Sequence, residues 1–451
     1  MSRAETEAGL PAEAPVEVRP PAGPETLFSA ARARLRQWTG ILSAYFSAQT
    51  LAQLLGIGAG LLFVNFMPKS EFALYTLAFS VVSFFHFLTD LGSSASLVYF
   101  RRKALEDGED FRDYLAAVLT LRRGLFAAGA VAVLAGFPFW ARSEGFGGLE
   151  SGLAAAAIAL AVWFQIVSSI RLLVLRLHDR YAKSYRAEIL GGALRLALAG
   201  ALVVSALLHA WLGVLVAAIA SAAVARAARG DEWQPARRPS GELAPYRRKV
   251  IRYLLPTLPS ALYFSIQGPL VIWLAATFAG TEIIAEVGAL GRLGLVMGLF
   301  SGLIGVVFLP RLALIRDERR YRMRYLQFGA FLLALGGALF LGAAAFPEAF
   351  LMVLGPHYRG LHRELLLVVG SAALSLVDGY GVGINNARSW NRWQGPAVLL
   401  LVGVQVMLIA VLPLDTTFTL LLFRLATTAV GVAVQLAINV TGFLRPAWVH
   451  W

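Results

Sequence analysis

The 451-residue sequence contains no cysteine, which excludes disulfide bonds, thiolate nucleophiles and cysteine-ligated metals. Charged residues are scarce at 15%, whereas apolar residues make up 58%, a balance too apolar for an ordinary soluble domain. The zinc-protease, phosphate-binding-loop and serine-hydrolase motifs are also absent. We therefore expect a protein that is not an enzyme, with no catalytic residue, metal or cofactor, and we disfavour transport driven by ATP.

The net charge of +13 comes mainly from arginines that lie between long apolar runs. In a soluble protein this charge would suggest nucleic-acid binding, but the positive-inside rule explains arginines in the loops of a membrane protein. We therefore expect a membrane, and no nucleic acid, as a partner.

The apolar runs are each about 20 residues long, the length that a helix needs to cross the hydrocarbon core of a bilayer. They predict twelve transmembrane helices, at residues 41–66, 72–99, 116–139, 152–175, 187–208, 211–227, 251–278, 284–310, 325–346, 364–384, 395–413 and 416–441. Residues 1–35 are rich in Pro, Ala and Glu, which predicts a disordered N-terminal tail.

Alternate connections between the spans carry nearly all the Arg and Lys, and the opposite side holds only Lys69, Arg142, Arg359 and Arg363. This asymmetry predicts that both termini are cytoplasmic. The longest basic connection, residues 230–249, predicts a linker between an N-lobe (36–229) and a C-lobe (250–445), followed by a tail at 446–451. Weak repeats between the halves favour an all-α fold of two six-helix lobes, related by pseudo-two-fold symmetry around a central cavity.

Six segments carry a recognisable pattern: Met67–Ala78 and Leu88–Ser94 in the first half, and Leu255–Pro259, Gly280–Gly294, Phe308–Arg311 and Leu354–Arg359 in the second. Together they resemble the polysaccharide-exporter flippases. That family is the lipid-linked oligosaccharide branch of the multidrug/oligosaccharidyl-lipid/polysaccharide (MOP) superfamily. The resemblance implies a flippase of the bacterial inner membrane that moves an undecaprenyl-pyrophosphate-linked sugar repeat unit for O-antigen, capsule or exopolysaccharide synthesis. It also implies polysaccharide polymerase and co-polymerase proteins as candidate partners.

Arg292 is the sharpest candidate for substrate binding, because an ionisable group within lipid must face protein, water or substrate. It lies about 200° around the helix from Gly294, which begins a row of small residues suited to helix packing. We expect Arg292 to face the cavity and attract pyrophosphate, since a guanidinium offers a fork of donors to phosphate. A buried structural arginine is the alternative.

Other arginines are weaker candidates. Arg122 and Arg123 are expected mainly to snorkel to the membrane surface, with Arg123 retained as a cavity candidate. Arg171 and Arg195 are neighbours in a helical hairpin and could line one vestibule, whereas Arg424 is expected near the outer side.

Asp90, with His86 one turn before it, could form a protonation site for coupled transport, and Asp378 is a second ion-coupling candidate. For Asp90 a purely structural role is the alternative. Gln49, Gln53 and Gln267 could bind sugar hydroxyls, although hydrogen bonds between helices would explain them as well.

Two features leave alternatives open. Gln267 stands where members of the flippase family often carry an acid, so ion coupling at that place is in doubt. Pro256 and Pro259 predict a bend in the seventh span. The competing functions are a small-molecule exporter of the drug-extrusion branch and a non-transporting scaffold for polymer assembly. Cationic drugs favour acidic cavities, whereas the arginines here favour an anionic cargo.

Overall fold

The computed structural model describes residues 48–230, 233–236, 238–239, 241–304, 309, 312, 315, 317–388, 390 and 392–445. The expected tails, 1–35 and 446–451, lie outside these residues. The described part of the chain is helical, as expected from the apolar runs.

The first half forms a helix at Ala48–Phe66, followed by α2 (Lys69–Asp90), α3 (Ser93–Asp107), α4 (Phe111–Ser143), α5 (Gly148–Leu177), α6 (Tyr181–Val204) and α7 (Ala210–Ala227). The second half forms α8 (Ala244–Leu254), η1 (Leu255–Thr257), α9 (Leu258–Phe278), α10 (Thr281–Leu303), α12 (Glu318–Ala345), α13 (Pro347–Met352), η3 (Pro356–Tyr358), α14 (His362–Ala387), α15 (Gln394–Val411) and α16 (Thr417–Leu444).

Eleven helical segments of the described chain are long and apolar enough to cross a membrane. In that count α2 joins α3, and α8 joins α9. The eighth expected span corresponds to α10, which has 23 residues. The chain is therefore a multi-pass membrane protein.

The second expected span is not continuous. Residues 72–99 were expected to form one helix, but α2 ends at Asp90 and a new helix begins at Ser93. The backbone turns because Leu91 has φ 40° and Gly92 has φ 81°, a left-handed conformation that glycine adopts without steric cost. A Cβ on Gly92 would lie 3.7 Å from Leu254 of α8, so the break faces the start of the second half.

The bend expected at the seventh span is confirmed. One turn of 3₁₀ helix, η1, holds Pro256 and separates α8 from α9. Proline cannot donate the backbone hydrogen bond that would keep the α-helix continuous at that point.

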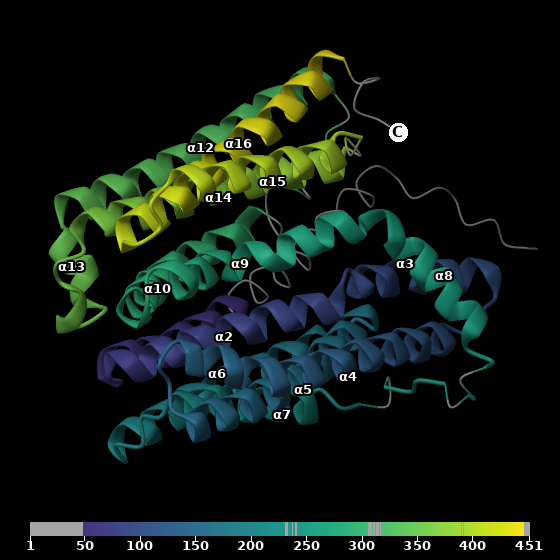
Figure 1. Ribbon diagram of the computed structural model, residues 1–451. Coiled ribbons are helices and arrows are strands. Elements are labelled where there is room, and N and C mark those ends of the chain that lie inside the picture. Colours follow the sequence, from purple (N-terminus) through teal and green to yellow (C-terminus); the bar gives the residue numbers. More distant parts are fainter. Residues whose placement is uncertain are drawn as a thin grey trace, which may run out of the picture. The chain divides into compact units, whose positions relative to one another are not determined.

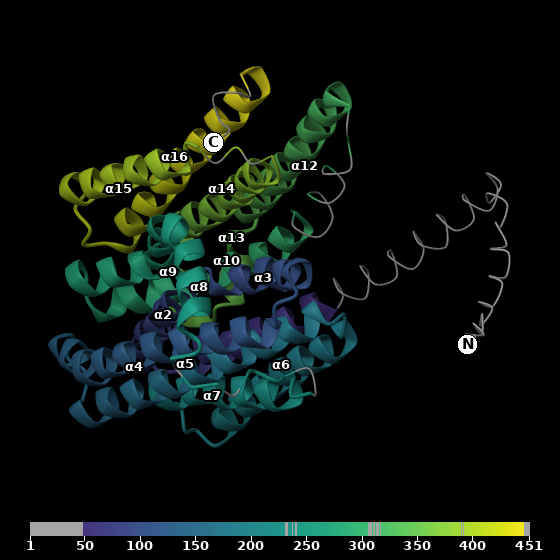
Figure 2. The ribbon, with the colours of Figure 1, turned by 90° about the vertical axis from the view of Figure 1, so that its right-hand side faces the viewer.

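The helices form two packed groups, and most contacts between the groups are made by α2 with α9 and α10, while α8 also packs against α3 and α4. Within the first group α5 packs against α4 and α7, and within the second α14 packs against α12 and α16. In both ribbon views α2 lies beside α9 and α10 (Figure 1, Figure 2), and these helices are in contact. A Cβ on Gly288 of α10 would lie 2.5 Å from the Thr76 hydroxyl, so only glycine permits this close approach.

Candidate functional site

Two arginines from different helices converge on a pair of aromatic rings in α2. The Arg292 guanidinium, on α10, lies 5.5 Å from the ring centres of both Tyr75 and Phe79. The Arg195 guanidinium, on α6, lies 5.3 Å from the Phe79 ring. Tyr75 and Phe79 are four residues apart and therefore share one face of α2, and both distances fall in the range of cation–π contacts. We call Arg195, Arg292, Tyr75 and Phe79 the central site.

The central site leaves a polar atom without a partner. Among the described residues no carboxylate forms an ion pair with Arg195 or Arg292. The Nε atom of Arg195 is buried without a hydrogen-bond partner, whereas the buried Tyr75 hydroxyl interacts with the guanidinium groups of both Arg195 and Arg292. Buried polar groups are normally paired, so an unpaired donor beside two cations favours a site that an added anion completes.

Close helix packing explains why the two arginines meet. A Cβ on Gly192 of α6 would lie 3.0 Å from the Ala52 carbonyl, so α6 runs against the first helix. A Cβ on Gly60 of that helix would lie 3.4 Å from a terminal nitrogen of Arg292. Arg292 is 9% exposed, so in this conformation it lies within the contact between the two helix groups.

Two of the expected glutamines lie on the helix face that meets Arg292. Gln53 precedes Gly60 by seven residues and Gln49 by eleven, which places each glutamine within about 20° of Gly60 on the helical wheel. By helical rise, Gln53 is about 10 Å and Gln49 about 16 Å from the level of Gly60. The buried Oε1 of Gln49 has no partner. Gln267 is partly buried on α9.

Asp90 has a different partner from the one that its spacing suggested. Its carboxylate pairs with Arg122 of α4 and also accepts from the Gly92 amide and from the amide and hydroxyl of Ser94. The Arg122 side chain is 1% exposed, so the expectation that it snorkels is wrong. The pair holds the break between α2 and α3, a structural arrangement. His86 contributes a buried Nδ1 without a hydrogen-bond partner.

Asp378 lies inside the second helix group. One of its carboxylate oxygens is 3.3 Å from where a Cβ on Gly431 would be, so it faces α16 from α14. No basic side chain of the described residues forms an ion pair with it. Its role in ion coupling, like that of Asp90 and His86, stays a prediction.

Arg171 does not join Arg195 in one vestibule. It donates to the Ala225 carbonyl at 2.5 Å, and its guanidinium lies 5.3 Å from the ring of Trp233 in the linker. Arg123 is exposed and lines the same region as Arg171. The predicted arginines therefore divide into the central site and a separate basic pocket beside the linker.

Arg424 is partly buried and lies seven residues after Thr417 on α16, hence on the same helix face. Thr417 donates to Glu286 of α10 at 2.6 Å. That face of α16 is therefore directed toward α10, which also carries Arg292.

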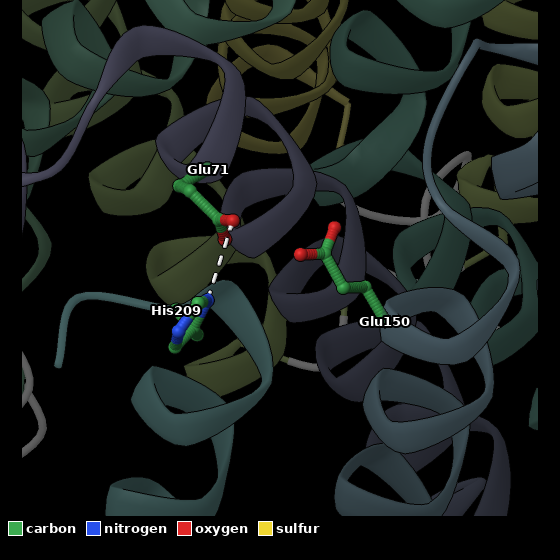
Figure 3. Close-up of side chains that lie close together, drawn as sticks. All are labelled: Glu71, Glu150 and His209. Carbon is green, nitrogen blue, oxygen red and sulfur yellow. Dashed lines mark ion pairs between the residues drawn. The ribbon is translucent and has the colours of Figure 1, made fainter.

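One group of side chains could hold a metal ion, although the sequence suggested none. Ligand atoms of Glu71, Glu150 and His209 lie within 4.8 Å of one another. Figure 3 shows Glu71 and His209 directed toward each other, with Glu150 on a neighbouring helix. Glu71 also accepts from the Ala210 amide at 2.6 Å, so hydrogen bonding to the start of α7 explains its position without a metal.

No family model and no curated protein matches this sequence. Solved structures do match. The lipid II flippase MurJ, in its inward closed conformation, is 13% identical, with 89% of each chain covered and a TM-score of 0.68. A MATE structure in complex with MaD3S is 16% identical, covering 89% of this chain and 96% of its own, with a TM-score of 0.60. The eukaryotic MATE transporter AtDTX14 is 10% identical, covering 90% of this chain and 96% of its own, with a TM-score of 0.56.

This chain has the MOP transporter fold. Identities below 20% limit the likeness to the fold, and the neighbours include both MATE transporters and a lipid II flippase. The two-lobed helical architecture expected from the sequence is thereby confirmed. The sequence singled out Arg195 and Arg292, whose role in substrate binding stays a prediction, but not Tyr75 and Phe79, which resemble ordinary core residues of an apolar helix.

Proposed function

We propose that the chain is a flippase that moves an undecaprenyl-pyrophosphate-linked oligosaccharide across the bacterial inner membrane by alternating access. One observation carries the proposal. Two guanidinium groups, Arg195 on the first helix group and Arg292 on the second, meet at the central site without a carboxylate partner among the described residues. A pair of unneutralised cations deep between helices favours an anionic ligand, and guanidinium groups bind phosphate oxygens in a fixed geometry.

The placement of the two arginines suits a cycle in which the lobes separate and close. Arg292 now contacts rings and a glycine of the first group, so separating the lobes would move it away from Arg195. A pyrophosphate between them would replace the cation–π contacts with charge-assisted hydrogen bonds. The glutamines on the face of Gly60 would then offer amide groups to the sugar hydroxyls.

Reconstituted flipping tests this function. Liposomes carrying the purified protein and a fluorescent polyprenyl-pyrophosphate oligosaccharide would report the fraction of probe accessible to a membrane-impermeant reagent. We expect Arg195→Gln and Arg292→Gln each to lower the initial rate at least about tenfold, since a hydrogen bond to a charged group contributes about 1.5–3 kcal/mol. Arg→Lys variants should retain part of the rate, because the charge remains but the fork geometry does not.

Arg319→Gln is the matched control. Arg319 is exposed at the start of α12 and outside the central site, so its removal changes the net charge equally without touching the proposed contacts. A full rate in Arg292→Gln at wild-type expression would refute the proposal.

A drug-type exporter is the second candidate, and the position of Asp378 favours it. A carboxylate inside the second helix group with no described basic partner is suited to binding a cation or a proton. Two results together would favour the exporter over the flippase: no lipid flipping by any variant or by the unmodified protein, and loss of cationic-dye efflux in Asp378→Asn. A scaffold without transport activity would give neither signal.

A further inference from the structure

A basic pocket lies beside the linker, away from the central site. A cavity of about 960 Å³ lies between α4 and the linker, and an adjoining one of about 350 Å³ lies between α4, α5 and α7. Arg123, Arg229 and Trp233 line both cavities. We call the two together the linker pocket.

Six arginines line the linker pocket, and none of its described lining residues is acidic. They are Arg112, Arg123, Arg171, Arg226, Arg229 and Arg238. Only Arg238 forms an ion pair within the described residues, with the buried Asp113 at 2.8 Å. The Nε atom of Arg171 is buried without a hydrogen-bond partner. Within the described part of the pocket these arginines have a single acidic partner, and their like charges repel one another, so an anion would stabilise the arrangement.

The smaller cavity has an apolar wall in addition to its arginines. Phe164, Ile166 and Val167 of α5 and Leu119 of α4 line it, next to Trp163. These helices are long and apolar enough to span a membrane, and Phe164 and Val167 stay partly exposed, which leaves apolar surface for an acyl chain. A pocket that is cationic at one end and apolar at the other matches an anionic lipid better than a free ion, and tryptophan is enriched at the depth of lipid headgroups.

We propose that the linker pocket binds an anionic phospholipid, with the phosphodiester against the arginines and an acyl chain along the apolar wall. Trp233 stacks on Arg171 and belongs to the linker, so a bound headgroup would hold the linker against α4, α5 and α7. The pocket lies apart from α2, α9 and α10, where the two helix groups meet. The proposal therefore does not depend on the identity of the transported cargo.

Binding of defined lipids to the purified full-length protein tests this site. Native mass spectrometry and thermal unfolding would compare dioleoylphosphatidylglycerol with dioleoylphosphatidylcholine. We expect preferential binding of phosphatidylglycerol with a rise in Tm, and at least about a tenfold higher Kd for phosphatidylglycerol in the double variant R123Q/R229Q. Both residues are exposed, so the variant should fold.

The control is R319Q/R320Q, which removes two exposed arginines from α12 and should leave the Kd unchanged. Equal losses in both double variants would show attraction to overall charge and overturn the site. Stabilisation by inorganic phosphate equal to that by the lipid would identify a soluble-anion site and overturn the lipid assignment. Competition by a polyprenyl pyrophosphate that outbinds phosphatidylglycerol would assign the pocket to cargo entry instead. Trp233→Phe should retain lipid binding, whereas Trp233→Ala should weaken it.

Discussion

Replacing Arg122 with Gln removes a buried guanidinium that ties the break between α2 and α3 to α4. Arg122 is 1% exposed and pairs with Asp90, and it also donates to the hydroxyls of Ser93 at 2.7 Å and Ser94 at 2.8 Å. Breaking a buried ion pair by removing one partner costs about 3–5 kcal/mol. Asp90 is 25% exposed and keeps its hydrogen bonds to Gly92 and Ser94. We therefore expect Arg122→Gln to lower the free energy of unfolding by about 3 kcal/mol, near the lower end of that range.

The reciprocal change, Asp90→Asn, should cost more because it leaves the less exposed charge unpaired. Equilibrium unfolding in mixed micelles, followed by circular dichroism, would give both free energies. Arg319→Gln serves as the control, because Arg319 is exposed, lies outside both proposed sites and should change stability by no more than about 0.5 kcal/mol.

A double-mutant cycle decides whether the pair itself is responsible. Residues in direct contact couple by about 0.5–3 kcal/mol, and we expect a value above about 1.5 kcal/mol for this pair. Additive losses in the Asp90→Asn, Arg122→Gln double variant would refute the reasoning. So would an Arg122→Gln protein as stable as Arg319→Gln.

Three further predictions concern contacts between the helix groups. Gly288→Ala should weaken the contact between α10 and α2, because the added Cβ would lie 2.5 Å from the Thr76 hydroxyl, and Thr76→Ala should restore much of the lost thermal stability. Lys249 and Tyr114 donate to the Glu109 carboxyl and hold its pKa below the ordinary 4.5. The resulting stabilisation is present above pH 4.5 and is lost as the pH falls through the lower pKa of the folded state. Unfolding midpoints measured between pH 6 and 3 should show this loss, and Lys249→Met should remove most of the pH dependence. Lys69→Met removes the ion pair with Glu282 between the helix groups, which contributes at most about 1 kcal/mol. A cysteine introduced between the groups should therefore be labelled up to about fivefold faster, because the groups separate more often.

The span pattern was predictable because a bilayer imposes a length and an apolar character on each helix, whatever packs around it. Even the 3₁₀ turn at Pro256 follows from the residue itself, since proline lacks the backbone donor. The break at Leu91 and Gly92 was missed, because its cause lies partly in Arg122, thirty residues further along the chain.

The sequence by itself determined that this chain crosses the membrane many times and that its intramembrane charges would need partners. Only the tertiary structure decided which partner each charge has: Arg122 was assigned to Asp90, Arg171 to Trp233, and Arg195 and Arg292 to the same aromatic pair. The physical reason is that helical periodicity fixes the face on which a side chain lies, whereas the neighbour on that face depends on how closely other helices approach. At Gly60, Gly192 and Gly288 that approach depends on the absence of a side chain, a property that has meaning only when the opposing helix is known.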